Sequence, residues 1–122
     1  MILVDTSVWV DHLRAGDDAL AALLSSGGVL AHPCVIGEIA LGTLRRRKVV
    51  LSDLHDLPQA IVATDAEALS FIERRALSGL GIGYVDACLL ASTQLTAGSA
   101  FWTRDKRLAD VAEKLGLEWS PD

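Results

Sequence analysis

Four acidic residues of the 122-residue sequence lie within apolar stretches or next to them: Asp5, Glu38, Asp86 and Asp105. Burying a lone carboxylate is costly, so each of them needs a compensating partner. Four carboxylates that converged without cations would repel one another and raise their pKa values. A hard divalent cation removes this problem, and Mg²⁺ or Mn²⁺ prefers oxygen ligands and keeps several waters for phosphate substrates. Such a site can hold a phosphodiester and activate water for its hydrolysis.

Each acid also has a simpler structural explanation. Asp5 and Asp105 precede expected helices and could cap them. Asp86 could be a first-turn acid that stabilises the N-terminus of its helix. Glu38 stands in the middle of an expected helix, where it cannot cap, but it could pair with an arginine such as Arg14 or Arg45. Because capping and metal binding are compatible, we predict that all four acids are metal ligands and catalytic residues.

Two hydroxyl residues, Ser7 and Thr103, each stand two positions from one of these acids. We expect them to support the site by hydrogen bonding to a carboxylate or to a metal-bound water. Zinc would prefer histidine and cysteine ligands. The three histidines and two cysteines lack the close spacing of a zinc motif, and two cysteines do not make a disulfide framework. Zinc is therefore not expected, and a reduced, cytoplasmic setting is.

The composition predicts one globular domain over residues 1–122, with 51% hydrophobic and 22% charged residues. No apolar run is long enough to span a membrane, and the first run is cut by Asp5 and has no basic flank, unlike a signal peptide. A net charge of −5 argues against a broad basic face that coats nucleic acid. It leaves room for an enzyme that binds nucleic acid locally, through a metal and a few arginines.

The basic residues form two clusters. One is the run at residues 45–48, and the other surrounds Asp105 and consists of Arg104, Lys106 and Arg107. A solvated helix end and a charged loop are their simplest explanations. In a nuclease, the cluster around Asp105 would bind the nucleic-acid backbone, and the run at residues 45–48 could contribute to the same surface.

Strands and helices are expected to alternate along the chain. Apolar runs predict strands at residues 2–4, 29–31, 60–63, 100–103 and 117–119. Helical periodicity and caps predict helices at residues 6–15, 19–25, 34–44, 51–57, 65–77, 84–96 and 106–115. This order predicts an α/β fold whose central parallel sheet of four to five strands has helices on both faces. Ligands bind such sheets at the carboxyl ends of the strands, where Asp5 and Asp105 are expected.

Four segments of the chain resemble the motifs of PIN-domain ribonucleases, and most closely those of VapC toxins from bacterial toxin–antitoxin pairs. They are Val-Asp-Thr-Ser-Val-Trp at 4–9, Pro-Cys-Val-Ile-Gly-Glu-Ile-Ala-Leu-Gly at 33–42, Gly-Ile-Gly-Tyr-Val-Asp-Ala-Cys-Leu-Leu-Ala-Ser at 81–92 and Trp-Thr-Arg-Asp at 102–105. Together they span essentially the whole chain. In that family the acids that match Asp5, Glu38, Asp86 and Asp105 form the metal site.

The resemblance implies a Mg²⁺-dependent endoribonuclease toxin, with a VapB-type antitoxin, a structured RNA substrate and a toxin homodimer. Either Glu38 or Asp105 would orient the attacking water. Cys88 departs from relatives that have histidine there, so a role of this side chain in RNA contact is not carried over. One alternative is a PIN-like module that binds without cutting. Another is a haloacid-dehalogenase-type phosphatase, but Ser7 stands where that chemistry needs a second aspartate.

Overall fold

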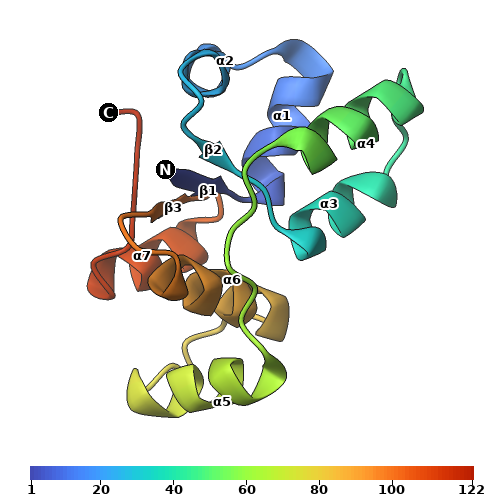
Figure 1. Ribbon diagram of the computed structural model, residues 1–122. Coiled ribbons are helices and arrows are strands. Elements are labelled where there is room, and N and C mark those ends of the chain that lie inside the picture. The colour runs from blue at the N-terminus through green and yellow to red at the C-terminus, as the bar shows by residue number, and fades with distance from the viewer.

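A parallel sheet runs through the middle of the molecule in the computed structural model, which describes residues 1–122 (Figure 1). Its strands are β1 (Ile2–Val4), β2 (Val29–Leu30) and β3 (Ala100–Trp102), in the order β2-β1-β3. Ile2 in the central strand is in register with Val29 on one side and Ala100 on the other. β1 is fully buried, as expected for a parallel strand covered on both faces.

Seven helices connect and cover the strands, because parallel neighbours need long crossovers. They are α1 (Thr6–Ala15), α2 (Asp18–Ser25), α3 (Pro33–Ala40), α4 (Arg47–Asp56), α5 (Asp65–Arg74), α6 (Tyr84–Leu95) and α7 (Lys106–Lys114). In Figure 1, α1, α2 and α4 lie above the sheet, α3 lies to its right, and α6 and α7 lie below it, while α5 packs against α6. The predicted α/β fold with helices on both faces is confirmed. No helix combines the length and the apolar character needed to cross a bilayer.

Two of the five predicted strands are wrong as strands. Residues 60–63 form no strand, and the isolated bridge to Ala31 comes from Gln59, just before them. Residues 117–119 contribute only an isolated bridge, between Glu118 and Phe101. Ile61 is 55% exposed, and its N–H donates to Oγ1 of Thr96, the residue that follows α6, instead of to a strand. The apolar run at 60–63 therefore follows the surface of α6, and the sheet has three strands.

The boundary between α3 and α4 also differs from the prediction. α3 ends at Ala40 instead of residue 44, and α4 begins at Arg47 instead of residue 51. Leu41 is 89% exposed, so no burial favours a longer α3. The basic run at 45–48 consequently covers the start of α4 and not the end of α3. Arg47 alone still reaches back, donating to the carbonyl oxygen of Ala40 at 2.6 Å.

Candidate active site

Asp5 lies at the carboxyl end of β1, where the pairing with β3 places it beside Thr103. Its backbone N–H donates to the carbonyl oxygen of Trp102, and its side chain is only 7% exposed. Oδ2 of Asp5 accepts hydrogen bonds from Oγ1 of Thr103 at 2.7 Å and from Oγ of Ser7 at 2.8 Å. The side chain makes no capping hydrogen bond to α1, although Asp5 occupies the N-cap position. Helix capping therefore does not explain this buried carboxylate.

Asp105, in contrast, does cap the helix that follows it. Its Oδ1 accepts a hydrogen bond from the backbone N–H of Leu108 at 3.1 Å in the first turn of α7. Its own backbone N–H donates to Oγ1 of Thr103, the hydroxyl that also binds Asp5. One threonine thus links the two acids at the carboxyl ends of neighbouring strands. The hydroxyls of Ser7 and Thr103 make the carboxylate contacts expected of them.

Glu38 is exposed, so the expectation that it is buried is wrong. The core-facing stripe of α3 consists of Val35, Ile36 and Ile39, and the small and apolar residues around Glu38 do not enclose it. Oε1 of Glu38 accepts a 2.7 Å hydrogen bond from Oγ1 of Thr6, and no arginine forms an ion pair with it. Thr6 directly follows Asp5, so this hydrogen bond connects the segment that carries Asp5 with α3.

Asp86 lies in the first turn of α6 and is partly buried. Its Oδ2 accepts a hydrogen bond from the backbone N–H of Gly83 at 3.1 Å. Burial raises the pKa of Asp86, and the negative charges of the three other acids raise it further, while the Gly83 hydrogen bond partly offsets both effects. The acids that act on it are Asp5, Asp105 and Glu38. The structure therefore brings all four predicted acids into one electrostatic neighbourhood.

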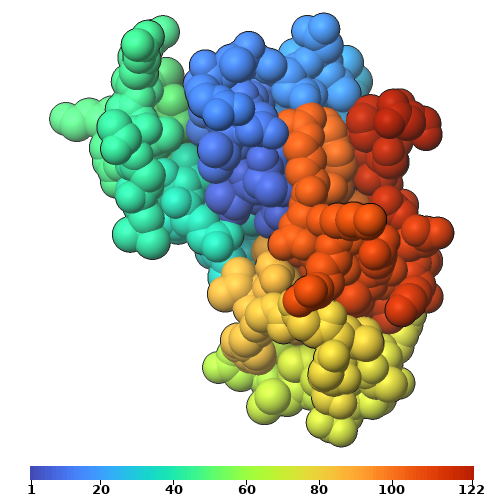
Figure 2. Space-filling model, turned by 180° about the vertical axis from the view of Figure 1, so that it is seen from behind, coloured from blue at the N-terminus to red at the C-terminus, as the bar shows by residue number.

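Figure 2 shows the corresponding segments meeting on one face: the blue N-terminal segment, teal α3, the gold start of α6 and the orange segment before α7. No group of three or more His, Cys, Asp or Glu side chains is arranged closely enough to hold a metal ion. The four carboxylates are thus electrostatic neighbours without forming a closed ligand shell.

The donor set nevertheless suits a hard divalent cation, because each acid keeps one carboxylate oxygen that accepts no hydrogen bond from the protein. These oxygens are Oδ1 of Asp5, Oε2 of Glu38, Oδ1 of Asp86 and Oδ2 of Asp105. The opposite oxygen of each carboxylate is held by a hydroxyl or a backbone N–H. Four oriented, anionic oxygen donors are the ligand type that Mg²⁺ or Mn²⁺ prefers.

Of the predicted backbone-binding residues, Arg104 is already occupied. Its guanidinium donates to Oδ2 of Asp11 at 2.8 Å and to Oδ2 of Asp17, and it lies over the Trp102 ring. Hydrogen bonds to these two aspartates raise the pKa of Arg104. Arg104 thus holds α1 and the turn after it against β3. Lys106 and Arg107 are exposed and form no ion pair.

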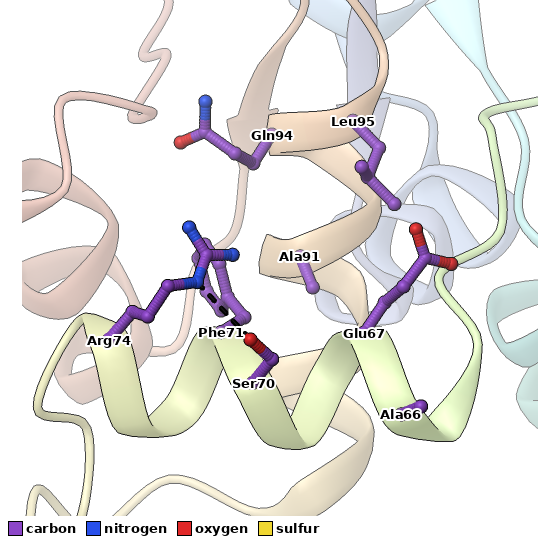
Figure 3. Close-up of a pocket in the computed structure, with 8 residues that line it drawn as sticks. All are labelled: Ala66, Glu67, Ser70, Phe71, Arg74, Ala91, Gln94 and Leu95. Carbon is purple, nitrogen blue, oxygen red and sulfur yellow. Dashed lines mark hydrogen bonds between the residues drawn. The ribbon is translucent and has the colours of Figure 1, made fainter.

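Two cavities differ in their relation to the acidic site. A groove of about 590 Å³ between α1, α3 and α4 includes Glu38 and Arg45 in its lining and so reaches the acidic site. A cavity of about 260 Å³ between α5 and α6 contains none of the predicted residues (Figure 3). In it, Nε of Arg74 donates to Ser70, and Glu67 completes the capping box with Thr64. Its polar groups therefore have structural partners.

Fold and site together define an α/β protein with an acidic cluster beyond the carboxyl ends of parallel strands. Residues 2–114 match the model of the PIN domain. The chain belongs to the PIN-domain family.

Individual relatives agree with this membership. The chain is 50% identical over 117 residues to ribonuclease VapC32 of Mycobacterium tuberculosis, found in two strains, covering 96% of this chain and 94% of the relative. The crystal structure of FitAcB from Neisseria gonorrhoeae superposes with a TM-score of 0.63 over 93% of this chain and 94% of that chain. At 22% identity, the FitAcB structure supports the fold alone.

Proposed function

We propose that residues 1–122 form a single PIN-like nuclease domain, a Mg²⁺-dependent endoribonuclease that is the toxin of a type II toxin–antitoxin system in the cytoplasm. The observation that carries the proposal is the acidic cluster, in which each carboxylate keeps one free oxygen donor. Half of the residues are identical to those of a relative named as a ribonuclease, over nearly the whole chain, which supports RNA as the substrate.

The residues that would hold Mg²⁺, or Mn²⁺ in its place, are Asp5, Glu38, Asp86 and Asp105. When bound, the cation would act as a Lewis acid on the phosphodiester and stabilise the leaving oxygen. Ser7 and Thr103 fix the orientation of Asp5 through their hydrogen bonds to Oδ2. In one of two acids, the free oxygen would instead orient the attacking water, either Oε2 of Glu38 or Oδ2 of Asp105. These two oxygens belong to the exposed acids, which an RNA strand can approach.

The test is RNA-end mapping after expression in a bacterial host. Wild type should produce new RNA ends, and Asp86→Asn should abolish them, because asparagine keeps the hydrogen bond from Gly83 but loses the charge. Asp65→Asn is the matched control, since Asp65 lies on α5 and its Oδ1 accepts from Tyr84 instead of facing the acids. Asp86→Asn cleaving as well as wild type in Mg²⁺ would refute the assignment. Calorimetry that found no Mg²⁺ or Mn²⁺ binding would favour a non-cleaving binding module instead.

For the antitoxin, we propose that a segment with apolar side chains and a basic residue fits the groove between α1, α3 and α4. Val10 is 51% exposed beside the groove lining of Leu13 and Ile39, and Glu38 supplies a negative charge at the same surface. Leu13→Asp should reduce co-purification with a co-expressed VapB-type antitoxin without reducing RNA cleavage. Equal co-purification would refute this docking surface. Sedimentation equilibrium tests the proposed homodimer.

A further inference from the structure

Arg107 lies across the backbone of Gly81, in the loop that precedes α6. A β-carbon added at Gly81 would lie 2.5 Å from Nη1 of Arg107, 2.7 Å from Cδ and 3.1 Å from Cζ. Contacts below about 3 Å are well inside the van der Waals separation of non-bonded carbon atoms. The position of this arginine therefore depends on the absence of a side chain at residue 81.

The contact between Arg107 and Gly81 joins the two segments that carry Asp86 and Asp105. Arg107 follows Asp105 by two residues in the first turn of α7, and Gly81 precedes Gly83, whose N–H binds Asp86, by two residues. In Figure 2 the orange start of α7 lies against the gold segment before α6. The guanidinium thus lies where the segments that carry Asp86 and Asp105 meet.

Arg107 is also without an anionic partner. The structure contains three ion pairs, formed by Arg14 and Arg104 with Asp11 and Asp17, and none involves Arg107. Arg104, by contrast, is held by two carboxylates. An exposed guanidinium without a carboxylate partner is available for an external anion.

We propose that Arg107, seated on Gly81, binds an RNA phosphate next to the one that is cleaved, and that Gly81 is the positioning residue for it. This inference rests on the proposed nuclease function. Arginine matches phosphate geometry with two parallel N–H donors. The acidic cluster would repel RNA, so a cation next to it offsets that repulsion.

The variants compared are Gly81→Ala, Arg107→Ala, Arg107→Lys and Gly79→Ala. Gly79 is the matched control because its φ of 76° is close to the 79° of Gly81, while an added β-carbon there meets nothing within 4 Å. Both glycine variants suffer the same backbone strain, but only Gly81→Ala displaces Arg107. Circular dichroism checks that each variant is folded.

In cleavage assays, Gly81→Ala and Arg107→Ala should each raise KM by about tenfold with a smaller change in kcat, since a charged hydrogen bond is lost. The double variant Gly81→Ala/Arg107→Ala should have the same KM as Arg107→Ala alone, because both changes remove the same contact. Gly79→Ala should stay within about twofold of wild type. Equal effects of Gly79→Ala and Gly81→Ala would overturn the role of Gly81.

Binding is measured by fluorescence anisotropy with a mixed-sequence single-stranded RNA oligonucleotide, on the Asp86→Asn background, as a function of salt. The logarithm of the RNA-binding constant falls as the logarithm of the salt concentration rises. Arg107→Ala should make this slope shallower by about 0.7, which corresponds to one lost phosphate contact, whereas Arg107→Lys should keep the wild-type slope. An unchanged slope for Arg107→Ala would overturn the inference while leaving the nuclease proposal intact. Conversely, a changed slope without any RNA cleavage by wild type would refute the nuclease and retain the phosphate contact.

Discussion

The hydroxyl of Thr103 donates a 2.7 Å hydrogen bond to Oδ2 of Asp5, joining residues 98 positions apart in the chain. The same hydroxyl accepts the backbone N–H of Asp105, so it ties both strand-end acids together. Parallel pairing of β1 with β3 creates this contact, because Val4 is in register with Trp102. A hydroxyl from the far end of the chain thus helps to orient a buried carboxylate, together with the nearby hydroxyl of Ser7.

Thr103→Val should therefore lower RNA cleavage by about tenfold or more, the usual cost of losing a hydrogen bond that orients a metal-binding carboxylate. Valine has nearly the same shape, and the unfolding free energy should fall by only about 1 kcal/mol. Thr103→Ser keeps the hydroxyl and is the matched control. Cleavage rates and urea denaturation measure the two effects. Wild-type cleavage by Thr103→Val would show that the orientation of Asp5 does not depend on this bond.

Asp105 combines two roles that substitutions can separate. Asparagine caps helices as well as aspartate does, whereas alanine does not, at a cost of about 1 kcal/mol. Asp105→Asn should thus keep the unfolding free energy of wild type, and Asp105→Ala should lose about 1 kcal/mol in urea denaturation. Both variants should lose RNA cleavage, because both lack the carboxylate charge. If Asp105→Asn cleaves normally, the residue is a cap only.

Much of the site could be predicted because strand ends and acids are local features. Asp5 directly follows an apolar run, and the expected parallel sheet put it at the same edge as Asp105. Glu38 shows the limit of this reasoning. Its small and apolar neighbours suggested burial, but the buried stripe of α3 passes beside it, and its partner Thr6 is 32 residues away in the sequence.

Other features could not be predicted because they depend on distant pairing. Arg104 binds Asp11 and Asp17, which are 93 and 87 residues earlier in the chain, so its sequence context gave no sign of its partners. The run at 60–63 has the composition of a strand. The side-chain hydroxyls of Ser92 and Thr96 bind its backbone instead, and local propensity does not predict them.

The charges around Asp86 should make metal-free stability depend on pH. Burial and the neighbouring carboxylates raise the pKa of Asp86 above the 3.8 of the unfolded chain. The folded protein then binds more protons than the unfolded one between these two values, so stability falls as pH rises through that window. In EDTA at neutral pH, Asp86→Asn should melt at a higher temperature than wild type. Mg²⁺ should raise the melting temperature of wild type more than that of the variant. A variant that melts lower in EDTA would contradict this repulsion.

A buried contact between His32 and Ser92 should give a second, independent pH dependence. Nδ1 of His32 accepts the backbone N–H of Cys34 at 3.0 Å, so the neutral ring carries its proton on Nε2, which lies 3.0 Å from Oγ of Ser92. Burial lowers the pKa of His32 below the 6.5 of the unfolded chain. The unfolded chain therefore binds the proton more readily, and stability is lost as pH falls from 6.5 towards the lowered pKa.

His32→Gln should flatten the pH dependence of the unfolding free energy below about pH 6.5, since glutamine does not titrate. Ser92→Ala tests the same contact from the other side. It removes the partner of both His32 and the Ala63 N–H, and should cost about 1–3 kcal/mol at neutral pH. Urea denaturation at a series of pH values measures both effects. His12→Gln is the matched control, because His12 lies outside this buried contact. This variant should keep the part of the pH dependence of the unfolding free energy below pH 6.5 that comes from His32. An unaltered slope in His32→Gln would show that this ring does not titrate on unfolding.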